Sequence, residues 1–474
     1  MSVETILLIL VLLAGFYTAW NIGANDVANA MGTSVGSGAL TLKQAVGLAA
    51  IFEFTGALFF GSHVSDTIQS GLINSSVFTG NPLILVYGML AALTGTGIWL
   101  QIASYFGWPV STTHSIVGGI IGFGAIVGGV DAVYWDNISF VFASWIVSPI
   151  LGGLVAYFIF TILRKQIFYT SEPVQNAKKY TPILVFIFMI IMVIMIMFHG
   201  LDHVSIKFTF FQTLAIGFGL ASLSSLLSYL WVRKIEVPTG SKDAQKLYNP
   251  EVIVALEKAK KHLLSAQSSS NGSHRYQLSL LNDEIDHLSS SYKQHEDPEL
   301  TSKEYAIVES IFGRLQIITA CCMAFAHGAN DVANAIGPLS AAISVLQTGY
   351  ISASAAIPVW QLALGGIGVV AGLATWGWRV IETIGRKITE LTPTRGFAAE
   401  FGAATTVVLA SRLGLPISTT HTLVGAVVGV GLARGIEALD LRTTRDIVIS
   451  WIVTIPIGAA ITIAIFYILL AIFG

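Results

Sequence analysis

Polar and charged side chains stand inside one of the most apolar parts of the sequence, in the segment that ends near residue 30. Asp26 lies between Asn25 and Asn29, and these two asparagines share one face of a helix because they are four positions apart. A charged side chain in hydrocarbon costs several kcal/mol, so it normally faces a cavity or a partner. Carboxylate and amide oxygens are hard ligands that suit a small, hard cation. The segment therefore predicts a cation site.

The same residues occur again near position 330, in a second apolar segment. The oxygen-bearing members of both copies form the predicted cation-binding set: Asn21, Asn25, Asp26, Asn29, Asn330, Asp331 and Asn334. His327 stands beside the second copy as a further functional candidate. The alternative is that Gly23, Ala24 and Ala28 only allow close helix packing, with the asparagines as bridges between helices. That alternative accounts for the small residues but leaves two buried aspartates unexplained.

A second motif combines a proline, three hydroxyl residues and a histidine, and it begins at Pro109 and again at Pro416. Proline followed by Ser or Thr is typical of a helix start, where unpaired backbone N–H groups and the helix dipole attract anions. The predicted anion-binding donors are six hydroxyls, which share the substrate site with Asp26 and Asp331: Ser111, Thr112, Thr113, Ser418, Thr419 and Thr420. The alternative is plain capping of two short helices.

Glu53 and Glu400 also stand inside apolar segments, but not at equivalent positions of the two halves. Each is a functional candidate by default, and proton transfer, cation binding and structural support are open for both. His114 and His421 end the second motif, and we expect them to anchor hydrogen bonds more than to titrate. The sequence has no Walker A motif, nucleophile elbow or zinc signature, so we expect neither an enzyme nor a resident cofactor.

The elements that hold these residues are expected to be membrane helices. Of the 474 residues, 54% are hydrophobic and 11% are charged, whereas soluble domains carry about 25% charged residues. The sequence divides into about twelve apolar segments, and roughly 20 residues suffice to cross a hydrocarbon core of about 30 Å. The predicted fold class is an all-α polytopic membrane protein. Two glycine-rich segments, 109–130 and 416–435, are expected to be second arms of re-entrant hairpins.

The chain contains one arrangement twice. Gly23 to Ala30 recurs unchanged as Gly328 to Ala335, and Trp145 with its two successors recurs at Trp451. Three motifs recur in one order at offsets of 305, 307 and 306. Seven membrane segments run from the first copy to the second, an odd number that inverts the second copy, as in many transporters. The predicted regions are 1–163 as the first inverted repeat, 164–232 as connecting transmembrane helices, 233–306 as a cytoplasmic loop with a helical hairpin, and 307–474 as the second inverted repeat.

Positive charge predicts the orientation in the membrane. Lys and Arg flank the short loops that follow residues 163, 378 and 434, and many more lie in the polar segment 233–306. Placing these segments inside puts both termini outside a cell membrane. The segment from Met1 to Trp20 lacks a basic start and carries Glu4, so we expect it to remain in the protein. The adjacent Cys321 and Cys322 imply no disulfide framework.

The two motifs resemble those of the PiT family of inorganic phosphate transporters, solute carrier family 20, which carries a duplicated GANDVANA-type signature and a duplicated proline-to-histidine element. The similarity covers nearly the whole apolar chain, including the surroundings of Glu53 and Glu400. It implies twelve membrane segments with inverted repeats, outside termini and a large inside loop. It also implies symport of orthophosphate with sodium or, in many bacterial members, with protons. In such a protein Asp26, Asp331 and their asparagines would serve the cation and substrate site, and the six hydroxyls would face phosphate.

The predicted function is import of inorganic phosphate by symport with sodium, because both signature copies are intact, as in the sodium-coupled branch of that family. A proton-coupled phosphate symporter and a transporter of sulfate or another oxyanion are the alternatives with the same fold. An anion channel or a nutrient receptor is a further alternative, but buried carboxylates would repel the ion that passes through a simple anion pore. The predicted partners are phosphate, sodium and the lipid bilayer, without nucleic acid, and a homodimer is left open.

Overall fold

The computed structural model describes residues 2–197, 208–237, 250–270, 273–293, 298–352, 357–378, 380–381, 390–435 and 439–474. Within these ranges the regular structure is helical, apart from one isolated bridge between Ile73 and Val133. Eight of the described helices are long and apolar enough to cross a membrane. The predicted all-α membrane fold is therefore confirmed, while the number of crossings and the re-entry of the hairpins stay predictions.

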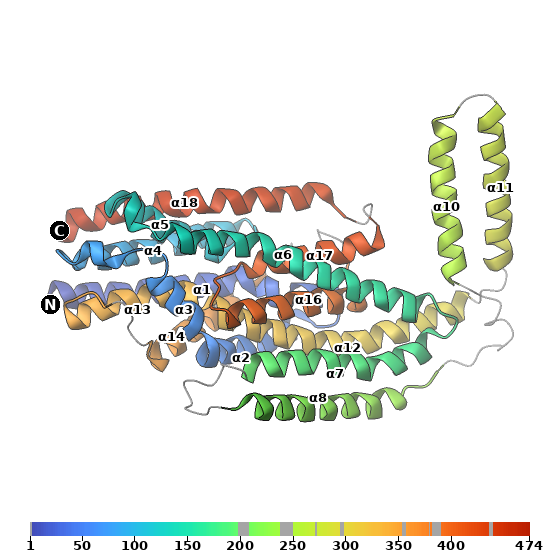
Figure 1. Ribbon diagram of the computed structural model, residues 1–474, viewed down its shortest axis with the longest axis horizontal. Coiled ribbons are helices and arrows are strands. Elements are labelled where there is room, and N and C mark those ends of the chain that lie inside the picture. Colours follow the sequence, from blue (N-terminus) through green and yellow to red (C-terminus); the bar gives the residue numbers. More distant parts are fainter. Residues whose placement is uncertain are drawn as a thin grey trace. The chain divides into compact units, whose positions relative to one another are not determined.

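The described chain forms two compact units (Figure 1). The first comprises Met1–Ile159, Ile190–Gly219 and Gly313–Gly474, and the second comprises Phe160–Met189 and Leu220–Phe312. In chain order the elements are α1 (Val3–Gly36), α2 (Leu42–Phe60), α3 (Ser62–Ser70), η1 (Ser75–Phe78), α4 (Leu83–Tyr105), α5 (Thr112–Val127), η2 (Val130–Ala132), α6 (Trp135–Leu163), η3 (Arg164–Phe168), α7 (Pro173–Met197), α8 (Phe210–Arg233), α10 (Pro250–Ser268), α11 (Ser273–Lys293), α12 (Pro298–Asp331), α13 (Ala333–Thr348), α14 (Val359–Thr375), α16 (Pro393–Arg412), α17 (Thr419–Arg434) and α18 (Leu441–Phe473).

Glycines of the duplicated signature bring helix backbones into contact. A Cβ atom added at Gly23 of α1 would lie 1.9 Å from the carbonyl oxygen of Val369 on α14. A Cβ at Gly328 of α12 would lie 2.1 Å from the carbonyl oxygen of Glu53 on α2. Small residues permit this close approach between membrane helices. The signature glycines therefore do allow close helix packing, as the packing alternative states. The same packing fixes the positions of the aspartates and asparagines beside them.

Two helical hairpins carry the anion motifs. The first joins α4 to α5 through a turn at Gly107, and the second joins α16 to α17 through a turn at Gly414. These glycines occupy equivalent positions of the two halves and have φ angles of +68° and +65°. Glycine adopts such left-handed conformations without a steric penalty from a Cβ atom. Each turn then extends through a proline to a serine that begins the next helix.

The two helices that begin at the predicted anion-binding motifs, α5 and α17, are here called the anion helices. They pack against helices from the opposite half of the chain. A Cβ added at Gly425 of α17 would lie 2.3 Å from the carbonyl oxygen of Pro149 on α6, and a Cβ at Gly429 would lie 2.1 Å from that of Gly153. Correspondingly, a Cβ at Gly458 of α18 would lie 2.5 Å from the carbonyl oxygen of Ser115 on α5. The first repeat therefore supports the anion helix of the second, and the second supports that of the first.

Both termini lie at one end of the first unit, marked N and C in Figure 1. There the Tyr87 hydroxyl on α4 donates to the carbonyl oxygen of Phe473, 3.0 Å away. Arg442 and Arg445, at the start of α18, lie about 45 Å along that helix from its C-terminal end, at 1.5 Å per residue. Near the start of α16, Glu390 pairs with Arg395 at 3.2 Å and with Arg434 at 3.4 Å. The hydrogen bond from Arg395 lowers the pKa of this exposed carboxyl.

The second unit contains two polar helices, α10 and α11, in the segment for which a hairpin is predicted. Lys260 on α10 pairs with Asp286 on α11 at 2.6 Å. Elsewhere in this unit, the Tyr305 hydroxyl on α12 donates to the carbonyl oxygen of Phe168, 3.3 Å away. The residues predicted to carry the chemistry all lie in the first unit.

Candidate functional site

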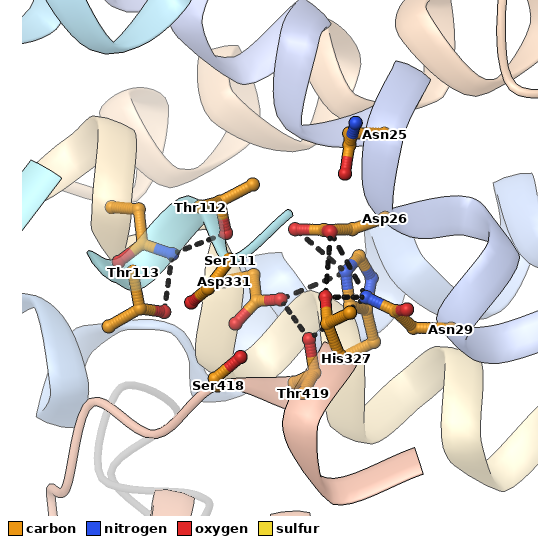
Figure 2. A network of polar contacts seen from close by, with 12 residues as sticks. Asn25, Asp26, Asn29, Ser111, Thr112, Thr113, His327, Asp331, Ser418 and Thr419 are labelled. Atoms are coloured by element: carbon orange, nitrogen blue, oxygen red, sulfur yellow. Dashed lines mark hydrogen bonds and ion pairs between the residues drawn. The ribbon is translucent and has the colours of Figure 1, made fainter. Parts of the chain in front are cut away.

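Asp26, His327 and Asp331 come together in the interior of the first unit (Figure 2). Asp26 lies on α1, and Asp331 is the last residue of α12, where that helix breaks before α13. The Nε2 atom of His327 lies 3.0 Å from Oδ2 of Asp331 and 4.0 Å from Oδ2 of Asp26. All three side chains are buried, and one ligand atom from each lies within 4.8 Å of the others. The structure thus unites the two predicted aspartates in one cluster.

Glu53 extends this cluster from α2. Its Oε1 atom lies 3.2 Å from Nδ1 of His327, so the imidazole stands between a glutamate and the aspartate pair. The position equivalent to His327 in the first repeat is Ile22, which is also buried. His327 therefore breaks the symmetry of the two repeats at their meeting point. The sequence marks His327 only as an additional candidate, whereas the structure places it at the centre.

Hydroxyls at the start of α17 contact both aspartates. Thr419 donates through Oγ1 to Oδ2 of Asp331 at 2.6 Å, and Thr420 donates to Oδ1 of Asp26 at 3.3 Å. Both threonines are buried and belong to the first turn of their helix. The predicted cation and anion motifs are therefore neighbours in space. The two together form one candidate site, as the prediction of shared aspartates requires.

Two asparagines bind across the repeats. Asn29 on α1 donates through Nδ2 to Oγ1 of Thr420 at 2.7 Å and to Oδ1 of Asp26 at 3.0 Å. Asn334 on α13 donates through Nδ2 to Oγ1 of Thr112 at 3.2 Å and of Thr113 at 3.1 Å. Each signature asparagine thus contacts the anion motif of the other half.

The amide nitrogens of Asn25 and Asn330 hold the turns of the two hairpins. Asn25 donates to Oγ of Ser104 at 3.0 Å, and Asn330 donates to Oγ of Ser411 at 3.0 Å. In Figure 2, Asn25 lies apart from the bonded cluster. Asn21 donates to the carbonyl oxygen of Tyr17 one turn earlier on α1, at 2.9 Å. Of the seven predicted cation ligands, the structure brings Asp26, Asn29, Asp331 and Asn334 to the cluster with the threonines and leaves these three outside its contacts.

Ser111 and Ser418 cap the two anion helices. The Oγ atom of Ser111 accepts from the backbone N–H of His114 at 3.2 Å, and Oγ of Ser418 accepts from that of His421 at 3.2 Å. Both serines thus cap their helices, and their predicted role toward an anion stays a prediction. A capping hydroxyl still has its own proton to donate.

His114 and His421 lie side by side behind the anion motifs, with ring centroids 4.3 Å apart. Each ring also contacts a tryptophan: His114 lies 3.8 Å from Trp145, and His421 lies 3.6 Å from Trp451. Nδ1 of His114 lies 3.1 Å from the carbonyl oxygen of Trp451. These contacts agree with the expected anchoring role.

Glu400 on α16 forms a separate polar centre. Its Oε1 atom accepts from Ser34 at 2.7 Å and from Gln316 at 3.2 Å, and it also accepts from Thr33. Its Oε2 atom accepts from Thr319 at 2.7 Å. The carboxylate is fully buried and bound by four neutral donors from α1 and α12. Sequence reasoning missed these four residues, because single hydroxyls and amides are common in membrane helices and only Glu400 stood out.

The central cluster offers oxygen atoms that the described residues do not satisfy. Oδ2 of Asp26, Oδ1 of Asp331 and the amide oxygens of Asn29 and Asn334 are buried without hydrogen-bond partners among the described residues. Buried polar atoms without partners are costly and call for an explanation. Carboxylate and amide oxygens of this kind suit a desolvated cation. The helix starts of α5 and α17 add backbone N–H donors that suit an anion.

The chain is similar over most of its length to proteins named for phosphate transport. It is 48% identical over 461 residues to the chloroplastic inorganic phosphate transporter 2-1 of Arabidopsis thaliana, covering 96% of this chain and 70% of that one. A Chlamydia pneumoniae protein that carries the name phosphate permease is 46% identical, covering 98% and 99% of the two chains. A solved structure titled "The sodium-dependent phosphate transporter" is 37% identical with a TM-score of 0.76, covering 98% and 99%. Residues 22–462 match the description "Phosphate transporter family", and the chain therefore belongs to that family of membrane transporters.

Proposed function

We propose that this phosphate transporter imports inorganic phosphate by symport with sodium. One observation carries the proposal: Asp26 and Asp331 meet at a buried place where the hydroxyl-bearing starts of two helices also arrive. The aspartates are proposed to hold the cation, with Asn29 and Asn334 as neutral oxygen ligands. The threonines and the backbone N–H groups at the starts of α5 and α17 are proposed to hold phosphate.

Electrostatics favours co-binding of a cation in this arrangement. No lysine or arginine is among the described side chains that contact the two aspartates. Two like charges 4 Å apart repel by about 4 kcal/mol at an effective dielectric constant of 20. A phosphate anion beside two carboxylates would meet such repulsion twice. Cations bound to the carboxylates remove it, so each substrate would favour the binding of the other.

Sodium is the proposed coupling ion for two reasons. The unpartnered oxygens of the cluster are hard ligands, and hard ligands favour alkali and alkaline-earth cations over softer ions. The solved structure with a TM-score of 0.76 carries the word sodium-dependent in its title. Proton coupling is the second candidate, because Glu53 and Glu400 are buried carboxylates that could each take up a proton.

The carboxylates also favour phosphate over sulfate. Phosphate at neutral pH keeps at least one hydroxyl, which can donate a hydrogen bond to an acceptor such as Oδ1 of Asp331. Sulfate has no proton, so the same oxygen would only repel it. Sites built to pair with a substrate hydroxyl reject analogues that lack it.

The proposed orientation places both termini outside a cell membrane and residues 233–306 inside. The common end of the two termini in the first unit supports their placement on one side. The arginines at the start of α18 support the opposite side as cytoplasmic. Cysteines introduced at Gly474 and Ser268, in a chain without Cys321 and Cys322, test this: labelling of intact cells at Ser268→Cys but not at Gly474→Cys would reverse the orientation.

Labelled-phosphate uptake into proteoliposomes, with the sodium gradient and the pH gradient imposed separately, tests the proposed coupling. Sodium symport predicts accumulation driven by an inward sodium gradient at equal pH on both sides. Accumulation driven only by an inward proton gradient would assign the coupling to protons. Uptake of labelled sulfate at the same rate would remove phosphate as the preferred substrate.

A further inference from the structure

Trp145 and Trp451 are equivalent residues of the two repeats, but their indole N–H groups differ in hydrogen bonding. The indole Nε1 of Trp145 on α6 donates to the carbonyl oxygen of Pro416 at 2.9 Å. The repeat predicts the matching bond from Trp451 on α18 to the carbonyl of Pro109. The structure lacks it, because Nε1 of Trp451 is buried without an acceptor among the described residues. A buried indole N–H usually finds a partner, so this orphaned donor needs an explanation.

The aromatic contacts around the two tryptophans are matched in the two halves. His114 contacts the ring of Trp145 and the carbonyl of Trp451, while His421 contacts the ring of Trp451 and the backbone of Trp145. Pro149 lacks an N–H, so it leaves the carbonyl of Trp145 four residues earlier without its helical partner and open to His421, whereas Ile455 stands at the equivalent position of α18. The four rings form one crossed cluster in which the two indole N–H groups differ.

The bond from Trp145 reaches the start of one of the two helices that carry the predicted anion donors. Pro416 lies two residues before Ser418, so this bond holds the start of α17. The threonines of α17 donate to the aspartates, at 2.6 Å and 3.3 Å. The threonines of both helices accept from an asparagine of the other half, those of α5 from Asn334 and those of α17 from Asn29. A tryptophan that binds or releases the proline carbonyl therefore acts on a helix whose hydroxyls line the site.

We propose that Trp145 and Trp451 are alternating latches that position the two anion helices. In the state seen here Trp145 binds Pro416 and Trp451 is released. In the state of opposite access, Trp451 binds Pro109 and Trp145 is released. In alternating access one repeat moves against the other around a fixed site. Because the repeats are inverted copies, a contact made by only one of two equivalent residues is expected to move to the other when access alternates. The inference rests on the inverted repeat of the proposed function and does not depend on which cation is transported.

A matched pair of substitutions tests the exchange. Trp145→Phe and Trp451→Phe keep an aromatic ring against each histidine and remove the indole N–H together with the five-membered part of the ring. The first loses a bond of this state and the second loses a bond of the opposite state, so they shift the equilibrium between the two states in opposite directions. Apparent affinity on each side scales with the population of the state open to that side. The ratio of the phosphate KM values in right-side-out and inside-out membrane vesicles reports that equilibrium.

We expect the KM ratio to change about two- to tenfold in each variant, with opposite signs, as the net value of one hydrogen bond implies. The double variant should return the ratio to near the wild-type value, which a merely structural role would not do. Trp360→Phe, at an exposed position of α14, should leave it unchanged. Shifts of the same sign, or no shift in Trp451→Phe, would overturn the proposal.

Trp451→Phe alone decides the proposal if Trp145→Phe fails to insert into the membrane, since the Trp451 N–H has no partner among the described residues in this state. Each vesicle type is assayed with whichever gradient drives uptake, so an error in the coupling ion does not affect the result.

Discussion

Asn29 on α1 donates a hydrogen bond of 2.7 Å to the hydroxyl of Thr420 on α17, although 391 positions separate them in the chain. The same amide also binds Asp26 at 3.0 Å. One side chain of the first signature therefore connects the proposed cation ligand to the anion motif of the other repeat. This contact gives a direct structural route for coupling between the two substrates.

Thr420→Val should weaken the apparent affinity for phosphate by roughly ten- to hundredfold, as expected for loss of one hydrogen bond to a charged group. The change keeps the shape of the side chain and removes the hydroxyl that contacts Asn29 and Asp26. Thr420→Ser restores the hydroxyl and should recover most of the affinity. Uptake measured over a range of phosphate concentrations checks both, and equal KM values for Thr420→Val and wild type would remove this hydroxyl from the site.

Asp26→Asn and Asp331→Asn should each abolish nearly all uptake while leaving insertion into the membrane normal. Asparagine keeps the size and can still accept from Asn29 or Thr419 through its carbonyl oxygen, but it removes the charge that is proposed to hold the cation. Vesicle uptake, with protein quantity measured in the same membranes, checks this. Sodium-driven uptake that persists in either variant would place the cation elsewhere.

Glu53→Gln should change the pH dependence of transport more than Glu400→Gln does, because it removes a charge beside the His327 imidazole. Glu53 lies 3.2 Å from a titratable imidazole, whereas Glu400 is bound by hydroxyls and an amide that do not titrate near neutral pH. Initial uptake rates across a pH series at fixed sodium compare the two variants. Unchanged pH profiles in both would assign both carboxylates to structure or to sodium, and a larger effect at Glu400 would reverse their proposed roles.

Gly429→Ala should lower the thermal stability of the purified protein. Its new Cβ would lie 2.1 Å from the carbonyl oxygen of Gly153, so α17 must move away from α6. Overpacking of this kind costs about 1–3 kcal/mol. Gly47→Ala is the matched control, because a Cβ there meets nothing within 4 Å and alanine is the better helix former. Equal melting temperatures for the two variants would show that the α6–α17 contact is not tight.

The repeats in the sequence predict that the two copies share one site. They do not predict that the asparagine of each copy contacts the anion motif of the other. Duplicated motifs at nearly constant offsets indicate that two copies meet, and the all-α membrane fold follows from composition. That Asn29 contacts the motif of the other half depends on the packing of α17 against α6 and of α5 against α18. Those contacts are set by backbone approach at single glycines such as Gly425 and Gly458, whose exact partners no spacing reveals.

Asymmetric features were the hardest to predict. His327 has Ile22 as its counterpart, and Glu53 reaches it from a helix outside both motifs. The repeat favours positions that recur in both halves, so it points to the asparagines more strongly than to His327. The amide nitrogens of Asn25 and Asn330 hold the hairpin turns, a contact that residue type and helical face do not reveal.

Calorimetric titration of phosphate into the purified protein at stepped sodium concentrations tests the central claim most directly. If cations at Asp26 and Asp331 remove the repulsion between the carboxylates and phosphate, phosphate affinity rises with sodium. Sodium affinity must then rise with phosphate by the same factor, because coupling between two binding equilibria is reciprocal. Phosphate affinity that changes with neither sodium nor pH would contradict the account, since the anion would then bind without any compensating cation.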